Sequence, residues 1–83
     1  MNDLRILMNE ESVIEGEKVS YELVRICFCG KICYVVGVSY LGEKRICALD
    51  VENERIATDM FVTLITYNTT PLILFDTVYE LLH

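Results

Sequence analysis

Residues 19–49 read VSYELVRICFCGKICYVVGVSYLGEKRICAL, and this stretch decides the fold. It is rich in β-branched and aromatic residues and is interrupted at Gly30-Lys31 and near Gly42-Glu43, which is typical of strands joined by short turns. Glycine in the first position of a two-residue link suits a type II′ hairpin turn, so we expect Cys29 to lie opposite Ile32. The stretch therefore predicts a three-stranded antiparallel meander.

Alternation along these strands sorts the side chains onto two faces, and both faces are apolar. One face holds Leu23, Cys27, Ile32, Tyr34, Val36, Val38, Cys47 and Leu49. The other face holds Val24, Ile26, Phe28, Cys33, Val35, Ile46 and Ala48. An antiparallel sheet with one solvated face normally alternates apolar and polar residues, so this pattern predicts that the second face is covered by a partner.

After Asp50 the apolar period becomes that of a helix, and we expect Asp50 to be its N-cap and Asn68 to end it. The first buried stripe is predicted to be Ile56, Ala57, Met60, Phe61, Leu64 and Ile65. Thr70 and Pro71 then indicate the N-cap and first position of a second helix. Its buried stripe is predicted to be Leu72, Phe75, Val78, Tyr79 and Leu82.

The N-terminal residues are less regular. Residues 3–8 alternate and predict a short edge strand, whereas residues 9–18 form an acidic connector that contains glycine. We therefore expect one domain over residues 1–83, with 1–18 partly ordered, 19–49 as a β-meander and 50–83 as two helices. The predicted fold class is α+β, a three- to four-stranded antiparallel meander followed by a C-terminal helical hairpin packed on one sheet face.

Several segments carry a resemblance to a known family. They are the strand 32–40 with its central Gly37, the strand end 48–50, the helix 56–67, the segment 68–71 and the closing helix 74–82. Together they resemble a family of short, uncharacterised proteins, a domain of unknown function, from anaerobic spore-forming Gram-positive bacteria. The resemblance implies this fold and a cytoplasmic location, and it implies no activity because the family has none assigned.

Composition and charge narrow the class of partner. The chain has 83 residues and is 53% hydrophobic, more apolar than so small a domain can easily bury alone. Its net charge is −6, and residues 50–83 hold six acids against Arg55 alone, which favours a basic partner on that side. No basic leader and no run of ~18 apolar residues is present, so we expect a cytoplasmic protein that does not enter a membrane.

Four cysteines form the sharpest local feature, Cys27, Cys29, Cys33 and Cys47. Four thiolates can bind zinc, but the spacing here differs from the usual pairs, and alternation places Cys33 on the face opposite the other three. Buried free cysteine also behaves as a small hydrophobic residue. We therefore predict no metal and no cofactor, and keep a metal- or thiol-dependent protein as an alternative.

No catalytic residue is predicted, and we expect a protein that is not an enzyme. His83 is the only histidine and lies at the end of the sequence, where a catalytic base is poorly held. The carboxylate pairs Asp50/Glu54 and Asp76/Glu80 have the spacing of a helix N-terminus and of a solvated helix face. Neither pattern predicts acid–base chemistry.

Five tyrosines keep a nucleic-acid binder open as a further alternative. Tyr21, Tyr34, Tyr40, Tyr67 and Tyr79 could stack on bases, and Arg25, Lys31, Lys44 and Arg45 could contact phosphates. The surrounding sequence lacks the dense basic charge on which such binding depends, so nucleic acid is a disfavoured partner.

The favoured interpretation is a small interaction or regulatory module that buries apolar surface against itself, as a homo-oligomer, or against a protein partner. The predicted contact residues on the sheet are Val24, Ile26, Phe28, Val35 and Ile46. Leu74 and Leu81 are predicted to form a second patch on the last helix.

Overall fold

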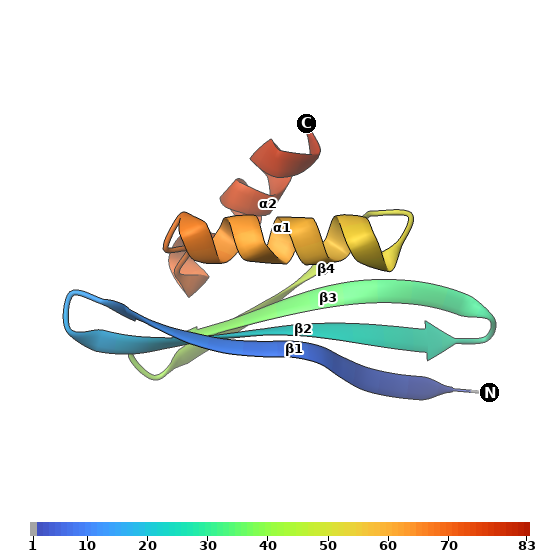
Figure 1. Cartoon of the computed structure of the whole chain (residues 1–83), viewed down its shortest axis with the longest axis horizontal. Helices are drawn as coiled ribbons and strands as arrows, with labels where there is room; N and C mark the ends of the chain where they lie inside the picture. Colours follow the sequence, from blue (N-terminus) through green and yellow to red (C-terminus); the bar gives the residue numbers. More distant parts are fainter. Residues whose placement is uncertain (1) are drawn as a thin grey trace.

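The computed structural model describes residues 2–83 and shows two layers, a sheet and a pair of helices (Figure 1). Four antiparallel strands form one sheet in the order β1-β2-β3-β4. The elements are β1 (Asp3–Ile14), β2 (Glu17–Phe28), β3 (Lys31–Tyr40), β4 (Glu43–Leu49), α1 (Glu54–Thr66), the 3-10 turn η1 (Pro71–Ile73) and α2 (Leu74–Leu82). Both helices lie on the same face of the sheet, so the predicted α+β fold class is confirmed.

Each of the three hairpins closes through a two-residue turn whose second residue is glycine. Both turn residues have positive φ, as at Cys29 (52°) and Gly30 (79°), and this geometry is that of a type I′ turn. The prediction that Gly30 comes first in its turn was therefore wrong, and Cys27 rather than Cys29 lies opposite Ile32. The register moves by two residues, and a shift of two leaves every side chain on its predicted face.

β1 is longer than the edge strand predicted over residues 3–8, and the connector predicted over residues 9–18 was wrong. β1 continues to Ile14 and pairs with β2 along its length. A β-bulge between Ile6 and Met8 inserts one extra residue, so the alternation reverses beyond it. Of the acidic residues that suggested a connector, Glu10 and Glu11 are exposed on this edge strand, where charge is tolerated and discourages pairing with other chains, while Glu15 lies in the turn and Glu17 begins β2.

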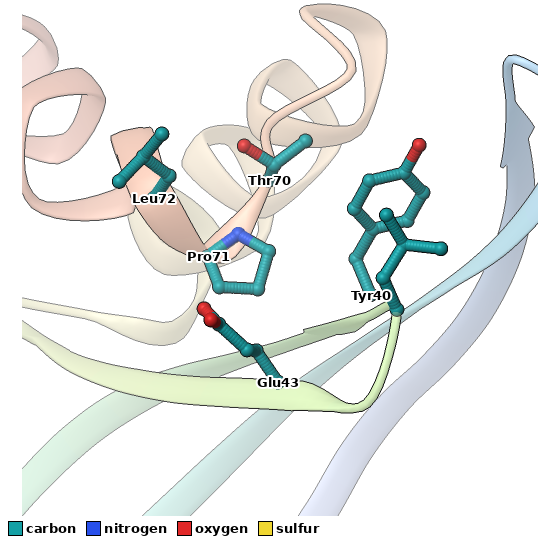
Figure 2. Close-up of a pocket in the computed structure, with 6 residues that line it drawn as sticks. Tyr40, Glu43, Thr70, Pro71 and Leu72 are labelled. Atoms are coloured by element: carbon teal, nitrogen blue, oxygen red, sulfur yellow. The ribbon is translucent and has the colours of Figure 1, made fainter.

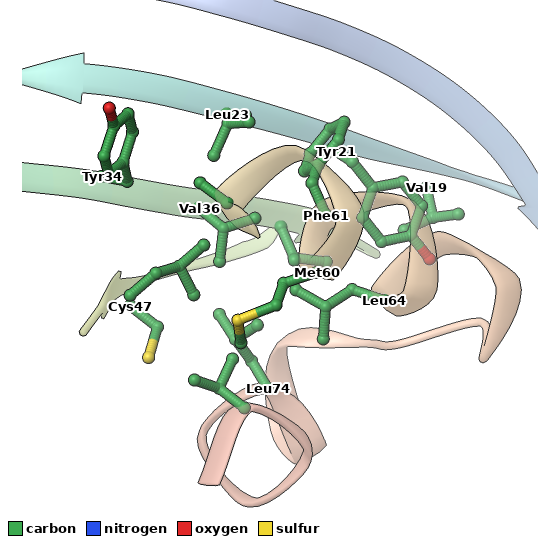
Figure 3. Packing of buried hydrophobic residues seen from close by; sticks show 14 residues of the cluster. Val19, Tyr21, Leu23, Tyr34, Val36, Cys47, Met60, Phe61, Leu64 and Leu74 are labelled. Atoms are coloured by element: carbon green, nitrogen blue, oxygen red, sulfur yellow. The ribbon is translucent and has the colours of Figure 1, made fainter. Parts of the chain in front are cut away.

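The core lies between the helices and one face of the sheet (Figure 3). The sheet supplies Val19, Tyr21, Leu23, Tyr34, Val36, Val38, Cys47 and Leu49, and the helices supply Ala57, Met60, Phe61, Leu64, Leu74 and Val78. The buried Tyr21 hydroxyl donates a hydrogen bond to the Thr69 carbonyl oxygen at 2.9 Å. This bond satisfies a polar group inside the core and joins the centre of the sheet to the link between the helices.

Helix α1 is capped at both ends, although not as predicted at its start. Asn53, not Asp50, is the N-cap, and its side-chain oxygen accepts a hydrogen bond from the Ile56 N–H at 3.0 Å. At the other end Asn68 adopts a left-handed conformation with φ of 54°. The N–H groups of Asn68 and Thr69 then donate to the carbonyl oxygens of Ile65 and Leu64. This Schellman arrangement confirms the predicted stop at Asn68.

Helix α2 is rotated from the predicted orientation. Pro71 is buried at the start of η1, and the buried positions that follow are Leu74 and Val78. Three members of the predicted stripe are exposed instead, namely Leu72, Phe75 and Tyr79. Residues 71–82 are apolar almost all round the helix, so the spacing of apolar residues could not fix which side meets the sheet.

Candidate interaction surface on the open sheet face

The face of the sheet away from the helices is uncovered in the described part of the chain (Figure 1). Its side chains follow from the register, because residues directly opposite one another share a face. Ile6, Val24, Val35 and Ala48 form a row across all four strands. We define the apolar patch as the apolar side chains in and beside this row, which are Leu4, Ile6, Val24, Ile26, Phe28, Cys33, Val35, Ile46 and Ala48.

The rim of the apolar patch is strongly exposed to solvent. Leu4 is 64% exposed, Ile6 56%, and Phe28 and Ile46 each 61%. The side chains between them are half-buried or small because the neighbouring strands crowd them. Contiguous apolar surface of this kind on a small protein is typical of an interaction site.

All five sheet residues predicted as contacts lie in this patch, Val24, Ile26, Phe28, Val35 and Ile46. The structure adds Leu4 and Ile6 from β1, which were not predicted as contacts. The missed signal was the Glu15-Gly16 pair, which closes the first hairpin and brings β1 beside β2. A Gly-containing acidic pair of this kind fits a type I′ turn as well as it fits a loop.

The other half of the same face is polar except for the exposed Val13, and its charges are paired. Lys18 lies 2.7 Å from Glu11, and Lys44 lies 3.0 Å from Glu22. The second pair reaches across β3 at Gly37, where a Cβ atom would stand 3.2 Å from the Glu22 carboxylate oxygen. The open face is therefore divided along the strands into an apolar half, bordered by the exposed Lys31 opposite Phe28, and a charge-paired half.

The two predicted contacts on the last helix are not on this face. Leu74 is fully buried in the core, so its prediction as a contact for a partner was wrong. The rotation of α2 explains the error, since the helix turns Leu74 toward the sheet. Leu81 is half-buried and packs against the same core.

The four cysteines do not converge on one point. Cys33 is exposed in the apolar patch and Cys29 is exposed in the β2–β3 turn, whereas Cys27 and Cys47 face the helix layer. Within residues 2–83, no three His, Cys, Asp or Glu side chains are grouped closely enough to hold a metal ion. Burial raises the pKa of the Cys47 thiol and shields its sulfur from solvent.

The tyrosines are likewise dispersed. Tyr21 and Tyr34 belong to the core, and the Tyr40 hydroxyl donates a hydrogen bond to the Ile14 carbonyl oxygen at 3.2 Å. Tyr67 and Tyr79 are exposed, but they lie after α1 and in α2. No shared stacking surface for bases results from these five positions.

Comparison of the chain with protein-family models, with curated protein sequences and with solved structures finds no significant match in any of the three. The resemblance to a family of spore-forming bacteria therefore stays a prediction. Among residues 2–83, no helix has both the length and the apolar character needed to cross a membrane.

Proposed function

We propose that the protein is a non-enzymatic cytoplasmic interaction module that binds a second copy of itself through the apolar patch. The observation that carries this proposal is an exposed apolar surface that crosses all four strands on a face with no helix over it. Apart from the Cys33 thiol, the patch contains no titratable group, so burial of apolar surface is the chemistry it supports. The exposed thiols of Cys29 and Cys33 suit a reducing compartment.

The division of the open face favours a two-fold arrangement of the copies. In a two-fold dimer each copy uses the same patch, so the symmetry axis lies in the interface between the two apolar halves. The charge-paired halves then extend outward in opposite directions and remain in water. Two sheets packed in this way would form a four-layer assembly with the helices on the outside.

The charge distribution supports the same arrangement. Each copy carries −6, and residues 50–83 in the helix layer account for −5 of that total. Sheet-to-sheet pairing places the two acidic layers at opposite ends of the assembly, where repulsion between them is weakest. The charges in the outward-extending polar halves are paired, Glu11 with Lys18 and Glu22 with Lys44, and so add little repulsion between the copies.

The expected affinity is moderate. Leu4, Ile6, Phe28 and Ile46 are each more than half exposed, so burying each of them contributes roughly 1–2 kcal/mol. Eight such side chains in the two copies offset the ~4–15 kcal/mol cost of lost translational and rotational freedom. These ranges allow a net gain of ~7–8 kcal/mol, which the proposal requires and which corresponds to dissociation in the low micromolar range.

Sedimentation equilibrium across a dilution series tests the proposal. The protein should pass from dimer to monomer, and Ile46→Glu should weaken the dimer by about tenfold or more, because it places a charge in the buried patch. Leu72→Glu is the matched control, since it changes an exposed residue on the helix layer by the same charge and should leave the dimer intact. A protein that stays monomeric at high micromolar concentration would contradict the proposal.

A further inference from the structure

A second exposed apolar surface lies on the opposite layer of the molecule. Leu72 is 76% exposed, Phe75 50% and Tyr79 65%. Their spacing of three and four residues places them along one side of η1 and α2. α2 runs away from the sheet toward its C-terminal end (Figure 1), where the Tyr79 ring lies 4.4 Å from the His83 ring, centroid to centroid.

A cavity of about 240 Å³ opens at the start of this surface (Figure 2). It is lined by Tyr40, Leu41, Glu43, Thr70, Pro71 and Leu72. Leu72 belongs to both the cavity and the exposed helix side, so the two features are continuous. The volume is below the ~300–1,000 Å³ of most small-molecule sites and suits a single large side chain.

We define the helical surface as this cavity together with Leu72, Phe75 and Tyr79. Acidic residues surround it. Glu43 lines the cavity and points from the start of β4 toward Pro71, while Asp76 and Glu80 lie roughly 90° round the helix from the apolar side chains.

Basic charge on this side of the molecule comes from arginines before α1 ends. Residues 56–83 contain no lysine or arginine, whereas the register places Arg5, Arg25 and Arg45 on the helix-facing side of the sheet. A second copy placed here would bring acidic residues against acidic residues, and an anionic lipid surface would be repelled in the same way. The charges therefore select an occupant with basic residues beside its apolar ones.

We propose that the helical surface binds a short basic amphipathic helix of another protein. One large apolar side chain of that helix enters the cavity beside Pro71, and the next apolar residues pack on Phe75 and Tyr79. Its lysine or arginine side chains face Asp76, Glu80 and Glu43. Recognition by apolar anchors at helical spacing, with charges at the rim, is a common way for a protein to bind a helix.

This site is independent of self-association, because it lies on the other layer. A dimer formed through the apolar patch would carry two helical surfaces on its two outer sides. The dimer would then hold two partner helices at once, and a partner that carries two such helices would bind its second site at a raised effective concentration.

The test uses two matched helical peptides, one of leucine and lysine and one of leucine and glutamate, each with leucine on one face. We expect the basic peptide to bind the full chain, with affinity that falls as salt is added. Backbone amide shifts in NMR should change at residues 41–43 and 70–80. The acidic peptide should not bind.

Variants localise the effect. Phe75→Lys should weaken binding of the basic peptide by about tenfold, since it removes an apolar contact and adds a repelling charge. The double variant Asp76→Lys/Glu80→Lys should favour the acidic peptide instead, while Ile46→Glu should bind the basic peptide as the unmodified protein does. Circular dichroism shows that each variant is folded.

Four outcomes would overturn the inference: no binding of the basic peptide, equal binding of the acidic one, shifts centred on the apolar patch, or unchanged binding by folded Phe75→Lys. Binding of the protein to anionic lipid vesicles, in preference to the basic peptide, would also overturn it and assign the surface to a membrane.

Discussion

The protein has two exposed apolar surfaces on opposite layers, and they differ in the charges around them. The apolar patch on the sheet lies beside charges that are paired within the chain, Glu11 with Lys18 and Glu22 with Lys44. The helical surface lies beside Glu43 at the start of β4 and beside Asp76 and Glu80 on α2, and residues 56–83 contain no lysine or arginine. A surface with internally paired charge can meet a copy of itself, whereas a surface of one sign needs a partner of the opposite sign.

The largest expected effect is a loss of stability, and it should differ between a leucine of the core, Leu74, and a leucine of the helical surface, Leu72. Leu74→Ala should destabilise the protein by roughly 2–5 kcal/mol, because it opens a cavity in a fully packed site. Leu72→Ala, two residues earlier, should change stability by less than about 0.5 kcal/mol, since that side chain is mostly in water. Urea unfolding measures both. A larger loss for Leu72→Ala than for Leu74→Ala would mean that α2 has the rotation predicted from the sequence.

Thiol labelling compares the two faces of the sheet in one experiment. Cys33 in the apolar patch should react rapidly with a maleimide at low protein concentration and about tenfold more slowly once most of the protein is dimeric. Cys29, in the turn, serves as the internal control and should react at the same rate throughout. Cys47 should stay unlabelled until unfolding, since burial raises the pKa of its thiol. Mass spectrometry of digested protein gives the rate for each site, and constant labelling of Cys33 would contradict self-association through the patch.

A turn variant separates stability from binding. Leu41 has a φ of 52° in the β3–β4 turn, and a leucine is strained there, whereas asparagine tolerates this conformation. Leu41→Asn should therefore raise the free energy of unfolding by about 0.5–1 kcal/mol. The same variant should weaken binding of the basic peptide, because Leu41 lines the cavity. Glu15→Asn, at the equivalent position of the first turn, should add similar stability without affecting the peptide. Loss of stability in both variants would show that the turns are not of this type.

The smallest effect concerns the polar half of the sheet. Lys44→Gln removes the ion pair with Glu22, and because both groups are partly exposed the loss should be only about 0.2–1 kcal/mol. Thermal unfolding at low and at high salt measures it, and the difference from the unmodified protein should shrink as salt is added. A larger loss that persists in high salt would mean that this half of the face is buried against something.

The sequence predicted the class of fold and the two faces of the sheet because both depend on simple periods. Val24, Ile26 and Phe28 alternate with residues of the core, and an error of two residues in the register leaves that alternation intact. The features that were not predicted depend on local irregularities of the backbone, which interrupt the alternation of apolar and polar residues. The bulge after Ile6 broke the alternation of β1 and hid the strand beyond it.

The helix layer was harder for a different reason. Apolar residues lie on more than one side of α2 and its leading turn, at Leu72, Leu74, Phe75 and Val78. Hydrophobicity alone therefore does not determine which side of the helix faces the sheet. The buried Pro71 and the 3-10 turn set the phase, and these are consequences of how the link after Thr69 packs on the sheet. The same excess of apolar residues that misled the prediction produces the exposed helical surface.

The central claim is that two copies of the protein make contact through the apolar patch. An isotope-filtered nuclear Overhauser experiment on a mixture of labelled and unlabelled protein observes such contacts directly. At millimolar concentration we expect cross-peaks between copies from Leu4, Ile6, Phe28 and Ile46, and none from Leu72, Phe75 or Tyr79. Cross-peaks between copies that arise from the helical surface, or none at all, would contradict it.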